Sequence, residues 1–171
     1  MPVPDLRQKL QDALSNSGGA SSDFDLNLDM KVPNGILTPA AVLIGIRAQT
    51  QTVILTKRAA RLKHHPGQIA FPGGKQDATD ATLIDAALRE AHEEIGLPAN
   101  LVDVLGELPP HQTVTGYQVT PVLAMIMGHY DIVAEAGEVS EVFEVPLAHV
   151  LDTAMYRTEG RRWQGRKRLY Y

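Results

Sequence analysis

The segment from Thr82 to Ile95 constrains the fold most, because its apolar residues recur with the period of an α-helix. These residues form one narrow stripe: Ile84, Leu88, Ala91 and Ile95. Thr82 and Asp85 have the spacing of a capping box at the start of a helix, and Gly96 is a typical stop signal. The pattern predicts one strong helix with a buried apolar face.

The sequence on both sides of this helix has the character of β-strands. Apolar, β-branched runs occupy residues 41–47 and 52–56 before the helix, and residues 101–108, 117–127 and 139–147 after it. Residues 62–74 are broken by prolines and glycines and predict a loop with one short strand. The final RRWQGRKRLYY is typical of a strand pair. Strands before and after a single strong helix favour an α/β domain with a mixed sheet.

The N-terminal residues differ from this core. Residues 4–15 are expected to form a short amphipathic helix with Leu6, Leu10 and Leu14 on one face. Residues 15–23 are small and polar and predict a flexible connector. We therefore divide the chain into an N-terminal extension, residues 1–35, and the main domain on which it docks, residues 36–171.

The composition excludes several classes of function. The 171 residues contain no cysteine, which excludes disulfides, thiolate catalysis and zinc–thiolate sites. The net charge of -4 argues against nucleic acid as a partner, because binding a long polyanion requires a clustered excess of Lys and Arg. No apolar run reaches the length that spans a bilayer, and the first ten residues lack an apolar secretory core. We therefore expect a cytoplasmic protein without a membrane partner.

Three carboxylates gather on the polar side of the predicted helix. Glu90, Glu93 and Glu94 are neighbours there, because positions three and four apart lie side by side. Their mutual repulsion is unfavourable, and the helix dipole disfavours negative charge at this C-terminal end. A bound divalent cation would reverse that effect, and hard oxygen ligands favour Mg²⁺ or Mn²⁺. A solvated acidic face is the alternative that composition leaves open.

Two motifs resemble a known family. Residues 89–97, REAHEEIGL, resemble the second half of the Nudix box, Arg-Glu-apolar-x-Glu-Glu-x-Gly-apolar. In the first half, Asp80 stands at the expected distance from Gly74, but eight residues instead of seven separate it from Arg89, so its role is open. Residues 53–75, VILTKRAARLKHHPGQIAFPGGK, are similar to the signature before the box in the coenzyme A pyrophosphatase branch, with Lys63 where the branch has Arg.

This resemblance implies a Nudix-type α/β/α sandwich with a mixed β-sheet and a loop–helix–loop catalytic motif. It implies Glu90 and Glu94 as the main metal ligands, with Glu93 as a further ligand or a carboxylate that orients water. Gly74, or its neighbour Gly73, would offer a backbone carbonyl to the Mg²⁺ or Mn²⁺ ion.

The implied catalytic residues are Glu90, Glu93 and Arg89. Arg89 would hold a glutamate in place, with a surface ion pair as the alternative. Glu90 is the first choice for the proton acceptor. Glu138 and Glu141 are weaker candidates, for which an ordinary exposed position at a strand edge is the alternative.

The implied reaction is the attack of water on a P–O–P linkage of a small nucleotide substrate. The leading hypothesis is cleavage of coenzyme A or acyl-CoA to 3′,5′-ADP and (acyl-)phosphopantetheine. A basic stretch is expected to bind the substrate's phosphates: Arg58, Arg61, Lys63, His64 and His65. The alternatives are a Nudix hydrolase of another nucleoside diphosphate derivative, such as ADP-ribose or NADH, and a non-catalytic nucleotide-binding module.

The C-terminal end differs from the resembling branch. That branch continues beyond a Tyr-rich strand into a further strand and a helix, whereas nothing follows Tyr171 here. We expect either a truncated C-terminal end or a core that closes differently, through a partner. Homodimer formation is left open.

Overall fold

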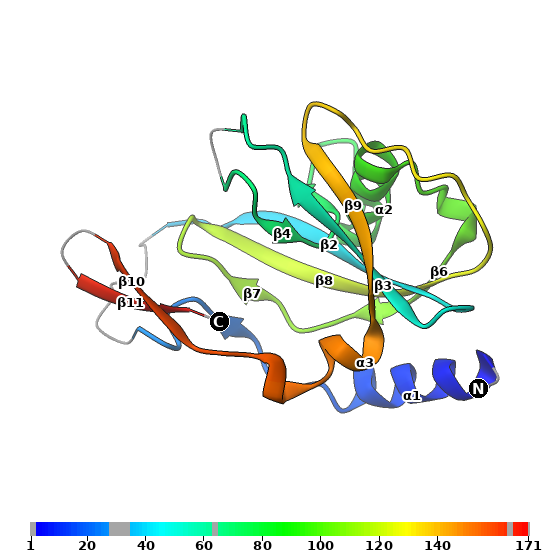
Figure 1. Cartoon of the computed structure of the whole chain (residues 1–171), viewed down its shortest axis with the longest axis horizontal. Coiled ribbons are helices and arrows are strands. Elements are labelled where there is room, and N and C mark those ends of the chain that lie inside the picture. Colours follow the sequence, from blue (N-terminus) through cyan, green and yellow to red (C-terminus); the bar gives the residue numbers. More distant parts are fainter. Residues whose placement is uncertain (1–2, 28–34, 63–64, 164–165, 171) are drawn as a thin grey trace.

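The centre of the molecule is one mixed β-sheet. The computed structural model describes residues 3–27, 35–62, 65–163 and 166–170 (Figure 1), and nine strands of this part belong to the sheet. The strands are β1 (Ser21–Ser22), β2 (Thr38–Arg47), β3 (Thr52–Arg58), β4 (Ile69–Ala70), β5 (Gly73–Lys75), β6 (Val102–Glu107), β7 (His111–Gln112), β8 (Tyr117–Ile126) and β9 (Val139–Pro146). The apolar runs of the sequence therefore form strands, as their β-branched composition predicts.

The strand order makes β2 the middle of the sheet. β2 pairs in parallel with β8 along its whole length, from Thr38 opposite Tyr117 to Arg47 opposite Ile126. It also forms an antiparallel hairpin with β3, and β9 lies antiparallel on the other side of β3. β6 and β7 pair with β8. Parallel and antiparallel pairs in one sheet confirm the prediction of a mixed sheet.

Helices cover both faces of this sheet (Figure 1). On one face α2 (Leu83–Ile95) packs its alanines and Ile95 against Leu43, Ile54 and Val122. On the other face α1 (Val3–Ser15) contributes Leu6 and Leu10 to a second cluster with Ile46 and Met125. This arrangement is the α/β/α sandwich that the resemblance implies. Apolar side chains alternate between the faces because successive strand residues point to opposite sides.

The expected loop at residues 62–74 holds two short strands instead of one. β4 pairs with β3, and β5 pairs with β2, with Gly73 opposite Val42 and Gly74 opposite Ala41. A Cβ atom at Gly73 would collide with the backbone oxygen of Ala41. Glycine thus lets β5 approach the middle of the sheet closely, which the breaker residues in the sequence did not indicate.

The expected flexible connector is partly ordered, so that prediction is wrong for its last residues. Ser21 and Ser22 form β1, which runs parallel to β7. The Oγ atom of Ser21 lies 2.8 Å from Nδ1 of His111, and the Asp23 carboxylate lies 3.0 Å from Nε2 of the same ring. Hydrogen bonds to residues almost ninety positions away order this segment, and no local sequence pattern announces them.

The helix α1 is integrated into the fold through its leucines, so we predict that Leu10→Ala destabilises the whole protein. Leu10 is 9% exposed and belongs to the cluster with Ile46 and Met125. Truncation of a buried leucine leaves a cavity and costs about 2–4 kcal/mol. Urea unfolding monitored by circular dichroism measures this loss. Gln8→Ala, at an exposed position on the same helix, is the control and is expected to change stability by less than about 0.5 kcal/mol.

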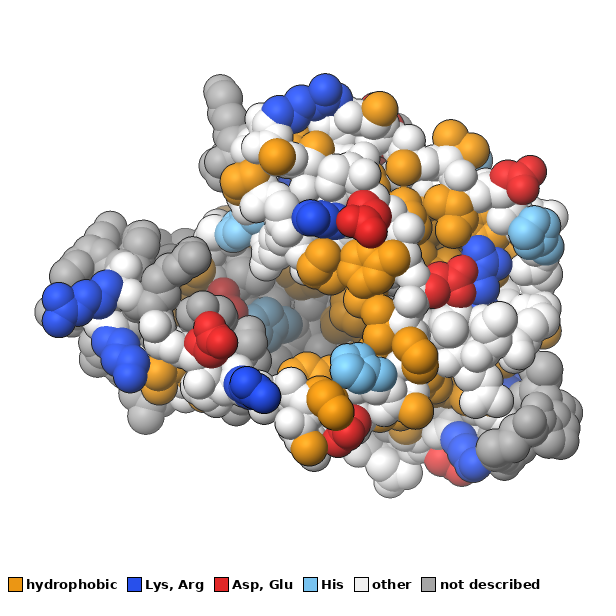
Figure 2. All heavy atoms as spheres, viewed as in Figure 1, with side chains coloured by type: hydrophobic (Ala, Val, Ile, Leu, Met, Phe, Trp, Pro, Cys, Tyr) orange, Lys and Arg blue, Asp and Glu red, His pale blue; other side chains and the backbone are white. Residues whose placement is uncertain are grey.

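The C-terminal part of the chain leaves the sheet as an exposed arm (Figure 1). It comprises α3 (Leu147–Val150), the turn η2 (Thr153–Met155) and a separate hairpin of β10 (Glu159–Trp163) and β11 (Arg166–Tyr170). The buried Asn27 anchors the hairpin, because its amide exchanges two hydrogen bonds with the backbone of Leu169. Figure 2 shows a hollow between the hairpin and the rest of the molecule, with apolar side chains along its border with the main body. None of the helices in the described residues is both long and apolar enough to cross a bilayer.

Candidate active site

The helix α2 is fixed at both ends by local interactions. The Thr82 side chain accepts a hydrogen bond from the Asp85 amide, and the Asp85 carboxylate accepts one from the Thr82 amide, which completes the predicted capping box. Gly96 ends the helix in the left-handed conformation with φ of 70°. A helix with both ends fixed holds the side chains of its last two turns at defined positions.

The two glycines of β5 bring the backbone against the helix carboxylates. The Gly73 amide donates a hydrogen bond of 3.2 Å to Oε2 of Glu94. At Gly74 a Cβ atom would collide with the carboxylate of Glu90. The two glycines of β5 therefore leave space for the carboxylates of Glu90 and Glu94, and a larger residue at Gly74 would displace the carboxylate of Glu90.

Asp80 has a clear role in the structure, although its offset in the sequence left that role open. Its side chain is 5% exposed and pairs with the Arg89 guanidinium through Nε and Nη2, each at 3.0 Å. The hydrogen bond from Arg89 holds the pKa of Asp80 below its ordinary value. Asp80 thus remains ionised and fixes the orientation of the guanidinium.

Arg89 in turn binds two of the helix glutamates. Its Nη1 atom lies 3.0 Å from Oε1 of Glu90 and 3.0 Å from Oε2 of Glu93. Its Nη2 atom also donates to the Lys75 carbonyl at 3.1 Å. The guanidinium therefore connects the loop before α2, the strand β5 and the acidic face of the helix. In the structure Arg89 has the geometry of a residue that positions glutamates.

The three glutamates differ in burial. Glu94 is 5% exposed, and burial raises its pKa to about 7. Burial also raises the pKa of the half-buried Glu90, although the hydrogen bond from Arg89 opposes this effect. The side chain of Glu93 is 55% exposed. The acidic face is therefore not simply a solvated one, because two of its carboxylates are held away from water.

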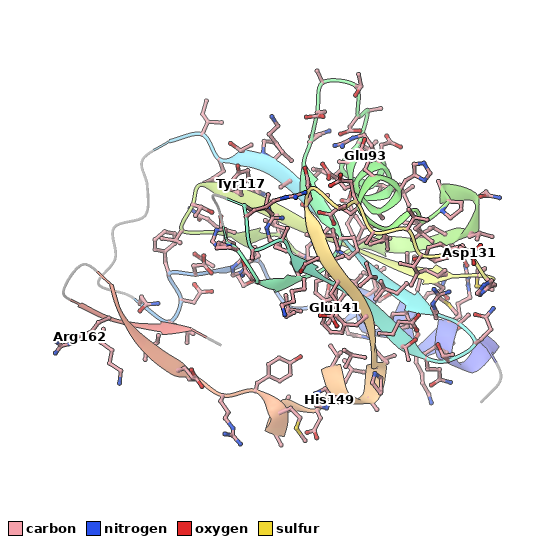
Figure 3. The ribbon with its side chains drawn as sticks, turned by 45° about the horizontal axis from the view of Figure 1, so that its top comes forward. Glu93, Tyr117, Asp131, Glu141, His149 and Arg162 are labelled. Atoms are coloured by element: carbon pink, nitrogen blue, oxygen red, sulfur yellow. The ribbon has the colours of Figure 1, made fainter. Side chains whose placement is uncertain are left out.

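These groups border a cleft of about 530 Å³. Its lining residues are Arg58, Gly73, Gly74, Asp77, Arg89, Glu90, Glu93, Glu94, Glu135 and Glu138. Six of them are carboxylates and two are guanidinium groups, which leaves an excess of negative charge. Of the two weaker candidates for the proton acceptor, Glu138 lines the cleft. Glu141 is absent from the lining and lies on β9 away from Glu93 in Figure 3.

Asp77 and Glu135 are cleft residues that the sequence did not single out. Glu135 reaches the cleft because its amide donates to the Glu94 carbonyl at 2.9 Å and the Val133 amide donates to the Ile95 carbonyl at 3.2 Å. These bonds fasten the segment after β8 to the end of α2. Asp77 lies in the sequence between the two glycines of β5 and Asp80, and this position could have indicated that it is near the cleft.

The basic residues that the sequence assigns to substrate have different positions. Arg58 lines the cleft, and its Nε atom is buried without a partner among the described residues. Arg61 donates instead to the carbonyls of Ala136 and Gly137, so it holds the loop beside the cleft. His65 is exposed and is not among the residues that line the cleft. Lys63 and His64 lie outside the described residues.

The donor set suits a hard divalent cation. Among the described residues no three acidic or histidine side chains are arranged to hold a metal ion by themselves. Mg²⁺ does not require such a set, because it usually takes one or two carboxylates and completes its shell with water and phosphate oxygens. Glu90 and Glu94 are two such carboxylates, partly desolvated and packed against the glycines of β5. A cation beside them would offset the cost of keeping them ionised.

Comparison with known proteins places these residues in a family context. Residues 37–163 match the NUDIX domain. Over 118 residues the chain is 51% identical to a protein of Enterobacter sp. (strain 638) named uncharacterized Nudix hydrolase NudL, a match that covers 68% of this chain and 62% of that protein. A protein with the same name from Cronobacter sakazakii is 52% identical over the same length. The chain thus spans about 62% of the length of the curated relatives that it matches.

Solved structures agree with this context. A Nudix hydrolase from M. smegmatis, RenU, is 26% identical, with a TM-score of 0.55 over 70% of this chain and 84% of that one. An Ap4A hydrolase from C. elegans is 21% identical, with a TM-score of 0.55 over 68% of this chain and 86% of that one. At 21% identity, the similarity to the Ap4A hydrolase shows a shared fold and nothing more.

Proposed function

This chain belongs to the Nudix family, and we propose that its cleft hydrolyses a pyrophosphate linkage in a nucleotide substrate with Mg²⁺ or Mn²⁺ as cofactor. The observation that carries the proposal is the pair of desolvated carboxylates, Glu90 and Glu94, against Gly73 and Gly74 of β5. Burying two negative charges side by side is unfavourable in a protein that binds no cation there.

The residues that would hold the cation are Glu90 and Glu94, with Glu93 as a further ligand and the carbonyl of Gly74 beside them. When bound, the cation supplies charge neutralisation at the phosphoryl oxygens and a more acidic water. Arg89, fixed by Asp80, keeps Glu90 and Glu93 in place. In the proposed reaction a water oxygen bonds to phosphorus, the bond from phosphorus to the bridging oxygen breaks, and a carboxylate accepts the water proton.

Glu90 is our first choice for that carboxylate. Burial raises its pKa, which makes it a better proton acceptor near neutral pH than an exposed glutamate. Glu138, which also lines the cleft, is the second choice. The pH dependence of turnover in Glu90→Gln and Glu138→Gln distinguishes the two candidates. Loss of the residue that accepts the proton should remove the acidic limb of the pH–rate profile.

For the substrate we propose coenzyme A or acyl-CoA, cleaved to 3′,5′-ADP and (acyl-)phosphopantetheine in the cytoplasm. Support comes from the signature at residues 54–74 and from the position of Arg58, whose buried Nε atom has no described partner. A phosphate oxygen of the substrate would supply that partner. The second candidate is another nucleoside diphosphate derivative, such as ADP-ribose or NADH.

The decisive experiment incubates the purified protein and Mn²⁺ separately with coenzyme A, ADP-ribose and NADH. Release of 3′,5′-ADP in preference to the other products supports the coenzyme A proposal, and cleavage of another substrate supports the second candidate. Binding without turnover would mean a non-catalytic nucleotide-binding module.

Arg58→Gln is expected to raise KM for the preferred substrate about tenfold, because it removes a charged hydrogen bond.

The raised pKa of Glu94 predicts how pH changes the stability of the metal-free protein. In the folded state this pKa is about 7, against 4.5 for an ordinary glutamate, so the folded state holds the proton more tightly. The contribution of Glu94 to the free energy of unfolding is therefore fully present below about pH 4.5. It is lost as pH rises from there through about 7. The total contribution is on the order of 3 kcal/mol.

Thermal melts in EDTA between pH 5 and pH 8 measure this effect. Addition of Mn²⁺ at pH 8 is expected to recover the lost stability, because the cation binds the ionised form. A melting temperature in EDTA that rises from pH 5 to pH 8, with no response to Mn²⁺, would contradict the assignment of Glu94 as a buried cation ligand.

A further inference from the structure

A second pocket lies at the opposite end of the β2–β3 hairpin from Arg58. It also has a volume of about 530 Å³, and it shares no lining residue with the glutamate cleft. Its walls are the turn between β2 and β3, the segment after β8 and one residue of β9: Arg47, Gln49, Thr50, Gly128, His129, Tyr130, Asp131, Ile132 and Glu144. In Figure 3 Asp131 marks this region and lies far from Glu93.

The pocket contains a buried arginine that the protein uses only in part. The side chain of Arg47 is 10% exposed, and its Nε atom donates to Glu144 at 2.6 Å. None of the described residues accepts a hydrogen bond from Nη1 or Nη2 of Arg47. Neither of these two nitrogen atoms is fully buried. Since Arg47 lines the pocket, its Nη groups are available there as donors.

Tyr130 adds a second incomplete group. The Arg47 guanidinium lies over its ring, 4.9 Å from the ring centre. Tyr130 is only 7% exposed, and its hydroxyl oxygen is buried without a hydrogen-bond partner in the described part of the chain. Burial raises the pKa of Tyr130 to about 12, so the hydroxyl keeps its proton and can donate it. A buried hydroxyl without a partner is unfavourable, and native proteins usually supply one.

The two carboxylates near Arg47, those of Glu144 and Asp131, both have partners of their own. Both oxygens of Glu144 accept hydrogen bonds within the wall, one from Arg47 and one from Thr52. The Asp131 side chain is 98% exposed and lies 3.6 Å from His129 on the outer rim. The backbone amides of His129, Tyr130 and Asp131 have no acceptor among the described residues. Arg47 and Tyr130 therefore carry donors that no described residue uses, whereas both oxygens of Glu144 already have donors.

We propose that this pocket is a second ligand site, which binds the phosphate or carboxylate group of a small molecule through the Nη groups of Arg47 and the hydroxyl of Tyr130. A planar guanidinium binds either oxyanion with two parallel hydrogen bonds, and packing on Tyr130 fixes its orientation in advance. The site is independent of the proposed hydrolysis, because it uses none of the residues of the cleft.

The test is an NMR titration of the metal-free, ¹⁵N-labelled protein with inorganic phosphate and, separately, with acetate. We expect saturable shifts of the amide resonances of residues 47–50 and 128–132 with at least one of the two anions. The comparison of phosphate with acetate identifies which group the site prefers. Shifts confined to residues 73–74 and 89–94, or no saturable shift with either anion, would overturn the proposal.

Two variants separate a ligand site from a structural ion pair. Arg47→Gln is expected to abolish the shifts, whereas Arg162→Gln, the same change on the exposed strand β10, should leave them intact. If Arg47→Gln does not fold, Tyr130→Phe decides. It removes only the hydroxyl, and we expect about a threefold to tenfold weaker affinity.

Tyr130→Phe also has a readout without ligand. Because the hydroxyl is buried without a partner, its removal is expected to raise the melting temperature by about 2–4 °C in buffer free of phosphate and carboxylates. Saturating ligand should cancel this gain. Unchanged affinity in Tyr130→Phe together with unchanged shifts in a folded Arg47→Gln would show that these residues bind no ligand.

Discussion

Replacing Glu94 by Gln is expected to lower turnover at least about a hundredfold and, in the absence of metal, to make the protein more stable at pH 8. The first effect follows if the carboxylate holds the cation. The second follows from its burial, because a neutral amide avoids the cost of an ionised group that is 5% exposed. The Gly73 amide can still donate to the carbonyl oxygen of the new side chain.

The same substitution elsewhere provides the controls. Glu93→Gln alters a side chain that is 55% exposed on the same helix, so no gain in melting temperature is expected in EDTA. Glu141→Gln lies outside the cleft and should retain normal turnover. Steady-state kinetics with Mn²⁺ and melts in EDTA at pH 8 measure both quantities. A Glu94→Gln enzyme with near-normal turnover would place the cation at other residues.

The parts of this site that could be predicted from the sequence are those encoded within one helix. The apolar stripe, the capping box and the stop at Gly96 all act over three or four residues, so a local pattern specifies the start, the end and the buried face of α2. Once the helix is placed, the grouping of Glu90, Glu93 and Glu94 follows from its geometry. The structure adds that two of the three are buried, which depends on the approach of β5.

The remaining parts depend on contacts between distant segments. Asp80 lies one position away from the place of the family's acid, yet the loop before α2 brings its carboxylate to Arg89. The sequence assigned Arg61 to substrate, whereas the fold provides carbonyl oxygens at Ala136 and Gly137 that bind it. Glu135 joins the cleft because its backbone is fastened to the end of α2. Such pairings have no periodic signal, since the two partners are separated by a variable length of chain.

We predict that Gly74→Ala lowers turnover about tenfold to a hundredfold while the protein folds with nearly normal stability. The added methyl group would meet the carboxylate of Glu90, which is the far end of a flexible side chain and can move away by giving up its hydrogen bond from Arg89. Folding is therefore preserved, and the loss of a glycine slightly disfavours the unfolded chain. The displaced carboxylate, however, would no longer face the proposed cation or the attacking water.

A double-mutant cycle tests whether Glu90 mediates this effect. If it does, Gly74→Ala combined with Glu90→Gln should be scarcely less active than Glu90→Gln alone, because both changes remove the same group. Gly19→Ala, at a position with open space around it, is the matched control and should keep full activity. Additive losses of turnover would show that Gly74 acts on something other than Glu90, and a loss of folding would show that the carboxylate cannot move. The cycle thus links the glycine that precedes the helix to one carboxylate on it, which is the contact on which the proposed chemistry depends.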